Sequence, residues 1–311
     1  MTKSTSIRLW ALAFILTLLL VAYQRLSGPT HPLRGSVETG TAKVAYKFLR
    51  SWTSHEPLPV RVSGDGIVAL RLHFRRYPLL EGEAWSAVPM AAENGSFRAF
   101  VPGQPAAGKV AYKVEAVTPA GTFWLNGGKP VLARFKDEVP AGLLLLHIIF
   151  MFAGMLLAFR AGLGALFNDN SWQRLVFWTL GVTAAGGLLL GPIVQKYAFG
   201  AFWTGFPLGG DLTDTKLLFV IVLWLLAFLL KKRSRYWTVL ATTLMVIVYL
   251  IPHSVLGSEL DYRTGKVETA KSVRSSMQHK SSTDFGGFDL SVPVGGRSSA
   301  LNCLPFGIEN G

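Results

Sequence analysis

Two histidines, His147 and His253, lie in or beside strongly hydrophobic segments of the chain. His147 is about two turns, or roughly 9 Å, inside one segment from its outer end, and His253 follows Pro252 at the outer end of another. An ionisable residue inside a membrane span is by default a functional candidate. Two histidines at similar depth could ligate a b-type haem axially, and together with Trp203 they could equally bind a quinone. In the competing interpretation, each histidine only hydrogen-bonds a neighbouring helix.

A group of acidic residues is expected on the same, outer side of the membrane. Carboxylate oxygens of this kind suit a divalent cation. The alternative is that these acids are solvated, cap helices and pair with Lys196 or Lys216. The group consists of Asp211, Asp214, Glu259 and Asp261.

The outer loop at residues 196–216 is rich in aromatic residues and glycine. Thr213 or Asp214 is expected to cap the helix that follows, because a side-chain oxygen can satisfy the free N–H groups of the first helical turn. Tryptophan and tyrosine favour the head-group level of a membrane, so the aromatic residues suit an interfacial belt or a shallow re-entrant segment. Those that we predict to contact a protein partner are Tyr197, Phe202, Trp203 and Phe206.

The motifs of common enzymes are not found in the sequence. It has no serine nucleophile elbow, no phosphate-binding glycine loop and no His-Glu-x-x-His zinc motif. The single cysteine, Cys303, excludes an internal disulfide and a cysteine-based metal site. Without Cys-x-x-Cys-His, covalent c-type haem is excluded as well. These observations favour a non-enzymatic protein with no catalytic residue, in which a cofactor enters only through the haem or quinone alternative.

Clustered hydrophobic residues indicate a membrane protein. They make up 50% of the chain, while charged residues make up 16%, below the roughly 25% usual for soluble domains. A run of about 20 apolar residues spans the hydrocarbon core as a helix. We predict an uncleaved N-terminal anchor within residues 1–25 and a four-helix module in residues 141–254. The helices of this module are expected at about 141–159, 175–195, 217–230 and 236–251.

The net charge of +13 is better explained by membrane topology than by nucleic-acid binding. If the N-terminus is cytoplasmic, the basic residues gather on the inner side, where Asp169 is the only acid, as the positive-inside rule requires. We therefore predict a protein of a bacterial inner membrane, embedded in the lipid bilayer and not bound to nucleic acid. The inner basic residues are Lys3, Arg8, Arg160, Arg174, Lys231, Lys232, Arg233 and Arg235.

Between the anchor and the four-helix module, after a turn-rich linker at 26–36, the hydrophobic period changes to two. In IVALRLHFRR, every second residue from Val68 to Phe74 is apolar, which predicts a half-buried antiparallel strand. Seven or so such strands, separated by turn signals within residues 37–137, are typical of a β-sandwich.

Residues 72–122 resemble the immunoglobulin-like or fibronectin-type-III-like domains of bacterial extracytoplasmic proteins. The resemblance is carried by WSAVPM, NGSFRAFVPGQPAAGKVAYKVEA and VTPAGT. It implies an outward-facing domain that binds or spaces other molecules. The chain lacks the Cys–Trp–Cys signature of antibody-type domains.

The expected fold class is thus an α+β membrane protein. It consists of an N-terminal anchor helix, an outward-facing immunoglobulin-like β-sandwich, a four-helix transmembrane module, and an outer tail (255–311) that is disordered after residue 263. The leading prediction for function is a binding or assembly component with a protein partner at the periplasmic face. The alternative is a redox module that holds b-type haem or quinone near that face.

Overall fold

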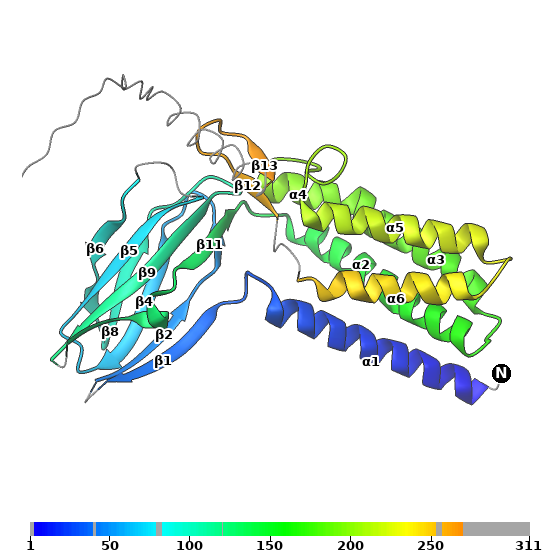
Figure 1. The fold of residues 1–311 in the computed structure, drawn as a ribbon, viewed down its shortest axis with the longest axis horizontal. Coiled ribbons are helices and arrows are strands. Elements are labelled where there is room, and N and C mark those ends of the chain that lie inside the picture. The colour runs from blue at the N-terminus through cyan, green and yellow to red at the C-terminus, as the bar shows by residue number, and fades with distance from the viewer. Residues whose placement is uncertain (1–2, 40–41, 79–82, 120, 253–256, 270–311) are drawn as a thin grey trace, which may run out of the picture.

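The computed structural model describes residues 3–39, 42–78, 83–119, 121–252 and 257–269. The fold is mixed α+β, with two large β-sheets at one end and a group of helices at the other (Figure 1). The N-terminus lies at the end of the helices that is farthest from the sheets (Figure 1).

Two sheets pack face to face around one core. The first has the strand order β1-β2-β4-β8-β7, and the second has the order β3-β11-β9-β5-β6, with β10 paired to β9. Pairing is antiparallel except between β3 and β11. The bounds are β1 (Leu33–Thr39), β2 (Ala42–Phe48), β3 (Ser51–Thr53), β4 (Leu58–Asp65), β5 (Ala69–Tyr77), β6 (Ser86–Pro89), β7 (Ala91–Glu93), β8 (Ser96–Val101), β9 (Lys109–Thr118), β10 (Gly121–Trp124) and β11 (Val131–Lys136).

Alternating apolar residues build the core between the sheets, as the period of two predicts. Phe48 of the first sheet meets Tyr112 of the second edge to face, with ring centroids 5.6 Å apart. The Tyr112 hydroxyl donates to the carbonyl of Leu49 at 2.7 Å, which satisfies its polar atom inside the core. In β5, Leu70 and Leu72 are buried as predicted, but Val68 is 63% exposed because it lies before the strand begins.

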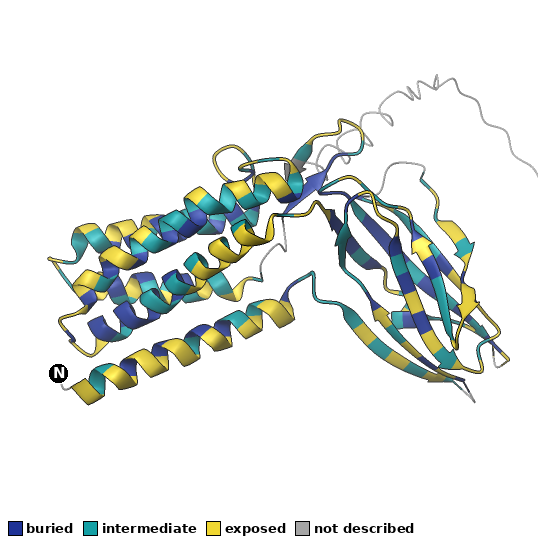
Figure 2. Ribbon diagram, turned by 180° about the vertical axis from the view of Figure 1, so that it is seen from behind, coloured by how far each residue is buried: buried dark blue, intermediate teal, exposed yellow. Residues whose placement is uncertain are grey.

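The first two helices differ in how far their neighbours cover them. α1 (Lys3–Ser27) buries only a stripe at every third or fourth residue and is exposed over much of its surface (Figure 2). α2 (Ala141–Leu166) is central and packs against α1, α3 and α6. A Cβ atom on Gly162 would lie 2.5 Å from the Thr242 hydroxyl of α6, so glycine is needed for this close approach. α2 continues past the predicted end at 159, because Arg160 is buried rather than placed at a membrane surface.

The next helical segment changes its hydrogen bonding in the middle. α3 (Trp172–Ala184) continues into a π-helical turn, η2 (Ala185–Leu190), and then into α4 (Gly191–Phe199). Pro192 has no N–H and its ring crowds the carbonyl four residues earlier, so a wider turn before it is physically reasonable. α4 ends at Gly200, whose φ of 82° is left-handed and favours glycine.

The last two helices form an antiparallel pair (Figure 1). α5 (Leu212–Leu230) starts five residues before the predicted 217. α6 (Tyr236–Leu250) has only 15 residues, fewer than the roughly 20 of a membrane span. It stops there because the residue before a proline avoids the helical region, and Ile251, which precedes Pro252, has a ψ of 117°. Among the residues that the structure describes, four helical segments are long and apolar enough to cross a membrane, namely α1, α2, α3 to α4, and α5.

A short hairpin follows α6 and returns to the sheets. β12 (Ser258–Leu260) pairs antiparallel with β13 (Val267–Thr269). Leu260 N–H donates to the Ala107 carbonyl at 3.2 Å, and the Tyr262 hydroxyl donates to the Lys109 carbonyl at 3.0 Å. The chain predicted to be disordered after 263 thus forms a strand at 267–269, and the rest of the predicted tail, from 270 on, lies outside the described residues.

Candidate functional site

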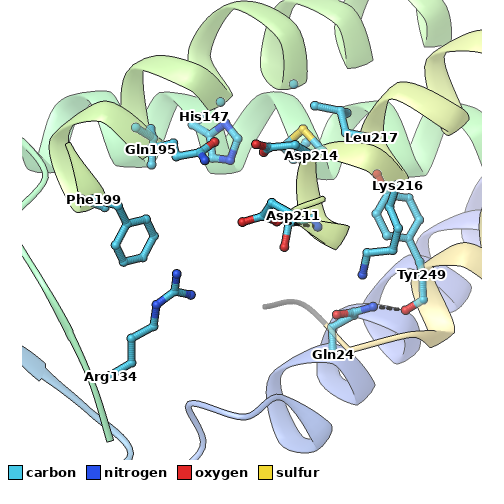
Figure 3. A pocket seen from close by; sticks show the side chains of 16 residues that line it. Gln24, Arg134, His147, Gln195, Phe199, Asp211, Asp214, Lys216, Leu217 and Tyr249 are labelled. Carbon is cyan, nitrogen blue, oxygen red and sulfur yellow. Dashed lines mark hydrogen bonds between the residues drawn. The ribbon is translucent and has the colours of Figure 1, made fainter. Parts of the chain in front are cut away.

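A cavity of about 180 Å³ lies where the helices meet the sheets. It is lined by residues of α1, α2, α4, α5, α6 and β11, together with Gly187 of η2 and Asp211 just before α5 (Figure 3). Its ionisable lining residues are Arg134, His147, Asp211, Asp214, Lys216 and Tyr249. Three of the residues predicted to carry chemistry, His147, Asp211 and Asp214, meet in this cavity.

Asp211 caps α5 and also binds the C-terminal hairpin. Its Oδ1 accepts from the N–H of Thr213 at 2.7 Å, which is the first-turn bond of a helix cap. Its Oδ2 accepts from both the N–H and the hydroxyl of Ser258, each at 2.7 Å. The predicted caps, Thr213 and Asp214, are therefore wrong. Asp211 takes the role because it stands immediately before the helix, in an extended conformation with a ψ of 119°.

Asp214 holds the preceding loop instead. Its Oδ2 accepts from the N–H groups of Thr204 and Gly205 at 2.8 and 3.1 Å. The hydroxyl of Thr204 lies 2.8 Å from that of Ser258 and accepts from Gln195 Nε2 at 2.7 Å. A single buried threonine thus connects α4, α5 and the hairpin.

Arg134 brings the second sheet into the same network. It comes from β11, is 9% exposed, donates to the Ser258 carbonyl, and places its guanidinium 4.1 Å from the centre of the Phe199 ring. Burial lowers the pKa of Arg134 to about 10, and the carboxylates of Asp211 and Glu259 oppose that shift.

The pKa of Asp211 responds in the opposite way to its surroundings. Burial alone would raise it. The hydrogen bonds from Ser258 and Thr213, together with the charge of Arg134, outweigh burial and hold the pKa of Asp211 below its ordinary value. Asp211 is therefore a stable anion.

The four acids proposed as a cation site are not assembled into one. Glu259 pairs with Lys109 at 2.5 Å, and Asp261 pairs with Arg263 at 3.1 Å, while Asp211 and Asp214 accept the hydrogen bonds given above. Within residues 3–269, gaps excepted, no group of three or more His, Cys, Asp or Glu side chains is arranged to hold a metal ion.

His147 lines the cavity, but the haem arrangement is not found around it. Its Nδ1 donates to the carbonyl of Gly186, in the π-helical turn, at 2.9 Å. His253, the second proposed ligand, lies outside the described residues. Trp203 is not part of the cavity lining, and its indole N–H donates to the Phe206 carbonyl at 3.1 Å. The cavity is also smaller than the roughly 300–1,000 Å³ of pockets for drug-sized ligands, so it does not fit a porphyrin.

Side chains from two other helices complete the C-terminus of the short α6. The carbonyls of a final helical turn have no partners within the helix. Lys216 Nζ donates to the Ile251 carbonyl at 2.9 Å, the Tyr23 hydroxyl donates to that of Leu250 at 3.0 Å, and Gln24 donates to that of Tyr249. α6 can end at this level because α1 and α5 supply the donors.

Replacing Lys216 by Met should therefore loosen the end of α6 without unfolding the helix group. The carbonyls of Ile251 and Pro252 would lose their charged donor, at a cost of about 1.5–3 kcal/mol. Hydrogen exchange of a peptide covering residues 246–252, in protein purified in detergent, should be faster than in the unchanged chain. Lys196→Met is the matched control, since Lys196 donates at the end of α4 instead. Equal exchange in both variants would contradict this role.

A second buried ion pair lies near the opposite end of the helices. Arg160 Nη2 donates to Asp169 Oδ2 at 2.5 Å, and Ser171 donates to the same oxygen at 2.7 Å. The Arg160 side chain is only 1% exposed. Arg160 was counted among the inner surface charges from the sequence, but the structure places it inside. Burial alone would raise the pKa of Asp169. The hydrogen bonds from Arg160 and Ser171 outweigh burial and keep this pKa below its ordinary value.

The loop before α5 is closely bonded internally and yet exposes large apolar side chains. Phe206 N–H donates to the Thr215 hydroxyl at 3.1 Å, and Asp211 N–H donates to the Thr204 carbonyl at 2.9 Å. The side chains exposed on or beside this loop are Tyr197 at 49%, Phe202 at 57%, Phe206 at 62% and Leu208 at 81%.

Comparisons with known proteins add little to this description. No protein-family model and no curated protein matches the chain. One matching solved structure, titled the crystal structure of a Br derivative of BhCBM56, is 8% identical, with a TM-score of 0.21, and covers 34% of this chain and 92% of its own.

The sequence did not reveal several residues of the site, notably Arg134, Thr204 and Ser258. Each is of a type that is common on protein surfaces, and they are more than 50 residues apart. Arg134 carried no signal either, because it alternates with the core residues Ala133 and Phe135 and so lies on the other face of β11, where a charged residue is ordinary.

Proposed function

We propose that the protein is a multi-pass protein of a bacterial inner membrane, with its N-terminus in the cytoplasm and its sandwich outside. The apolar surfaces of the helices support the membrane location. The basic turn at 231–235 lies at the same end of the helices as the N-terminus, away from the sheets (Figure 1), and this agrees with the positive-inside rule.

Within that setting, we propose a non-enzymatic role as a binding or assembly component. The observation that carries this proposal is the exposed apolar loop, which we define as residues 197–208. Its backbone is held by Asp214, Thr215 and Asp211, while Phe202, Phe206 and Leu208 are left exposed.

A rigid loop of this kind suits recognition. Fixing a loop in its bound conformation before association lowers the entropy cost of binding. Clustered exposed apolar residues on a soluble face mark sites of contact with proteins or membranes, and aromatic residues dominate the energetics of protein interfaces. The sandwich stands beside the loop and, in this proposal, offers a second surface to the same partner.

Photo-crosslinking in native membranes tests this function. A photoreactive amino acid placed at Phe206 should give one discrete protein adduct, and the double variant Phe202→Ser/Leu208→Ser should reduce its yield several-fold. The same probe at Tyr236, a 68%-exposed aromatic at the start of α6 and away from the loop and the sandwich, is the matched control and should not give this adduct.

Two outcomes would contradict the proposed role. Adducts to lipid alone from position 206 would make the loop a membrane anchor. Identical protein adducts from positions 206 and 236 would show non-specific proximity.

A further inference from the structure

The outer face of the first sheet carries a row of four basic residues. Arg34 of β1 lies directly opposite Lys47 of β2. Arg61 of β4 lies directly opposite Arg98 of β8. The register between β2 and β4, continued one step beyond its last pair, would place Lys47 opposite Arg61. These four residues, which we call the basic row, therefore cross four neighbouring strands (Figure 1).

The charges of the basic row are not balanced within the sheet. Like charges directly opposite each other on neighbouring strands are destabilising. Arg98 has Glu93 at 3.7 Å. Arg34, Lys47 and Arg61 are exposed and have no carboxylate partner among the residues that the structure describes. An anionic ligand along the row would offset this repulsion.

A groove of about 710 Å³ opens in the middle of the basic row. Lys47 and Arg61 belong to its lining, at the place where the ladder between β2 and β4 stops. The partly buried aromatic side chains of Tyr46 and Trp52 line it as well, because the strands no longer pair there. No acid belongs to this lining within the described part of the chain. A ligand that covers the row can thus insert an apolar side chain between two groups of bases.

The groove also offers polar groups that suit a peptide backbone. The indole N–H of Trp52 is buried and has no hydrogen-bond partner in the described part of the chain, and such a donor is costly. The edges of β2 and β4 have no strand partner on this side beyond the end of their ladder, and strand edges pair readily with another extended chain. Regularly spaced carbonyl and N–H groups complement both features, which favours a peptide over a polysaccharide or a lipid head group.

The length of the basic row sets the spacing of the ligand. Neighbouring strands lie about 4.8 Å apart, so four bases in line span roughly 14 Å. In an extended peptide, side chains on one face recur about every 7 Å. An acid, an apolar residue and a second acid at alternate positions therefore match two bases, the groove and the other two bases.

From this combination, we infer that the basic row binds an extended acidic segment of the protein partner, with one apolar side chain in the groove. The inference rests on the proposed function, because it gives a chemistry to the second surface that the sandwich offers to that partner. It involves none of the residues of the exposed apolar loop, so the two surfaces can be tested separately.

Titration with a synthetic peptide tests the basic row without the native partner. The probe is fluorescein-labelled Thr-Glu-Thr-Leu-Thr-Glu-Thr, which has the alternate acid, apolar and acid residues. The full-length protein, in nanodiscs of synthetic phosphatidylcholine, should bind it saturably, as measured by fluorescence anisotropy. The same peptide with glutamine in place of both glutamates is the ligand control and should not bind.

Two changes in the protein test the charges and the groove in turn. Lys47→Gln/Arg61→Gln should weaken binding at least about fivefold, because exposed ion pairs contribute modestly. Arg71→Gln/Lys129→Gln is the matched control, since it removes the same charge from two exposed positions outside the row, and it should bind like the unchanged chain. Ser63→Trp, at an exposed position of the groove lining, should weaken binding without any change in charge.

A photoreactive amino acid at Ser63 in native membranes joins this test to the proposed function. It should give the same protein adduct as position 206, and Lys47→Gln/Arg61→Gln should reduce the yield several-fold. A protein adduct at position 206 but none at 63 would overturn this inference alone. Peptide binding that depends on the two bases, with no protein adduct at either position, would contradict the proposed function alone.

Three further results would overturn the inference. The first is no saturable binding by the unchanged protein, or equal binding of the glutamine peptide. The second is equal binding by the Lys47→Gln/Arg61→Gln variant and its matched control, once circular dichroism and gel filtration have established that both are folded. The third is tighter binding of alginate or of phosphatidylglycerol vesicles with the same dependence on the two bases, which would assign the row to a polysaccharide or to a lipid surface.

Discussion

Asp211→Asn is expected to destabilise the junction between helices and sheets by about 3–5 kcal/mol, because it removes a buried anion that several donors share. The amide retains one acceptor oxygen but turns an NH2 group toward the remaining donors. Ser258 and Arg134 would lose the most, since Asp211 is an acceptor for the first and the nearby countercharge for the second.

Hydrogen exchange measures this effect locally, which suits a chain with two structural parts. Peptides covering residues 204–216 and 257–262 should exchange much faster in Asp211→Asn, while peptides of the sandwich core should not. Asp65→Asn, at an exposed position of β4, is the control and should change neither region. A uniform increase over the whole chain would contradict a local role for Asp211.

The same residue gives the junction a dependence on pH. The pKa of Asp211 in the folded protein is lowered from 3.8, so its stabilising contribution is complete above that value. The contribution is lost as the pH falls through the still lower pKa of the folded state. Exchange at residues 257–262 should therefore accelerate, beyond the intrinsic pH effect, only at strongly acidic pH, and Asp211→Asn should abolish that acceleration.

Asp169→Asn should have a comparably large effect at the other end of the helices. It would leave Arg160, 1% exposed, without its countercharge, and breaking a buried pair in this way costs about 3–5 kcal/mol. The apparent thermal midpoint of the protein in detergent should fall clearly. Asp137→Asn, at an exposed position, serves as the control.

The double variant Arg160→Met/Asp169→Asn separates the ion pair from simple packing. With no charge left to bury, it should be more stable than Asp169→Asn alone, since the two effects are coupled rather than additive. A double variant less stable than Asp169→Asn would show that Arg160 contributes mainly through its packing.

Local patterns were enough to predict the coarse fold. The period-two pattern of β5 and β9 predicts paired strands, and the apolar runs predict the helices, because each signal lies within one segment. The limits of the helices were less accurate. Arg160 resembles a boundary charge in the sequence, and only its contact with Asp169, across the turn between α2 and α3, shows that the helix continues past it.

The site was predicted only in part, for a physical reason. His147, Asp211 and Asp214 stand out because they are ionisable residues beside apolar runs. Thr204 and Ser258 become important only through their mutual contact at 2.8 Å, between residues 54 positions apart. Pairings of this kind depend on how helices and sheets are arranged in space, and no local period encodes that arrangement.

The position of Ser258 in the chain sets an order for biosynthesis. The sandwich is complete once β11 ends at Lys136, so in the proposed membrane topology it can fold as soon as it has crossed the membrane. Arg134 at its edge, however, has to wait for Asp211 and Ser258, which are translated 77 and 124 residues later. In that topology, a basic residue of a finished domain lacks its acceptor until α6 is in place and β12 emerges on the outer side. Under the proposed function, closure of the junction is thus the step that reports a fully inserted chain.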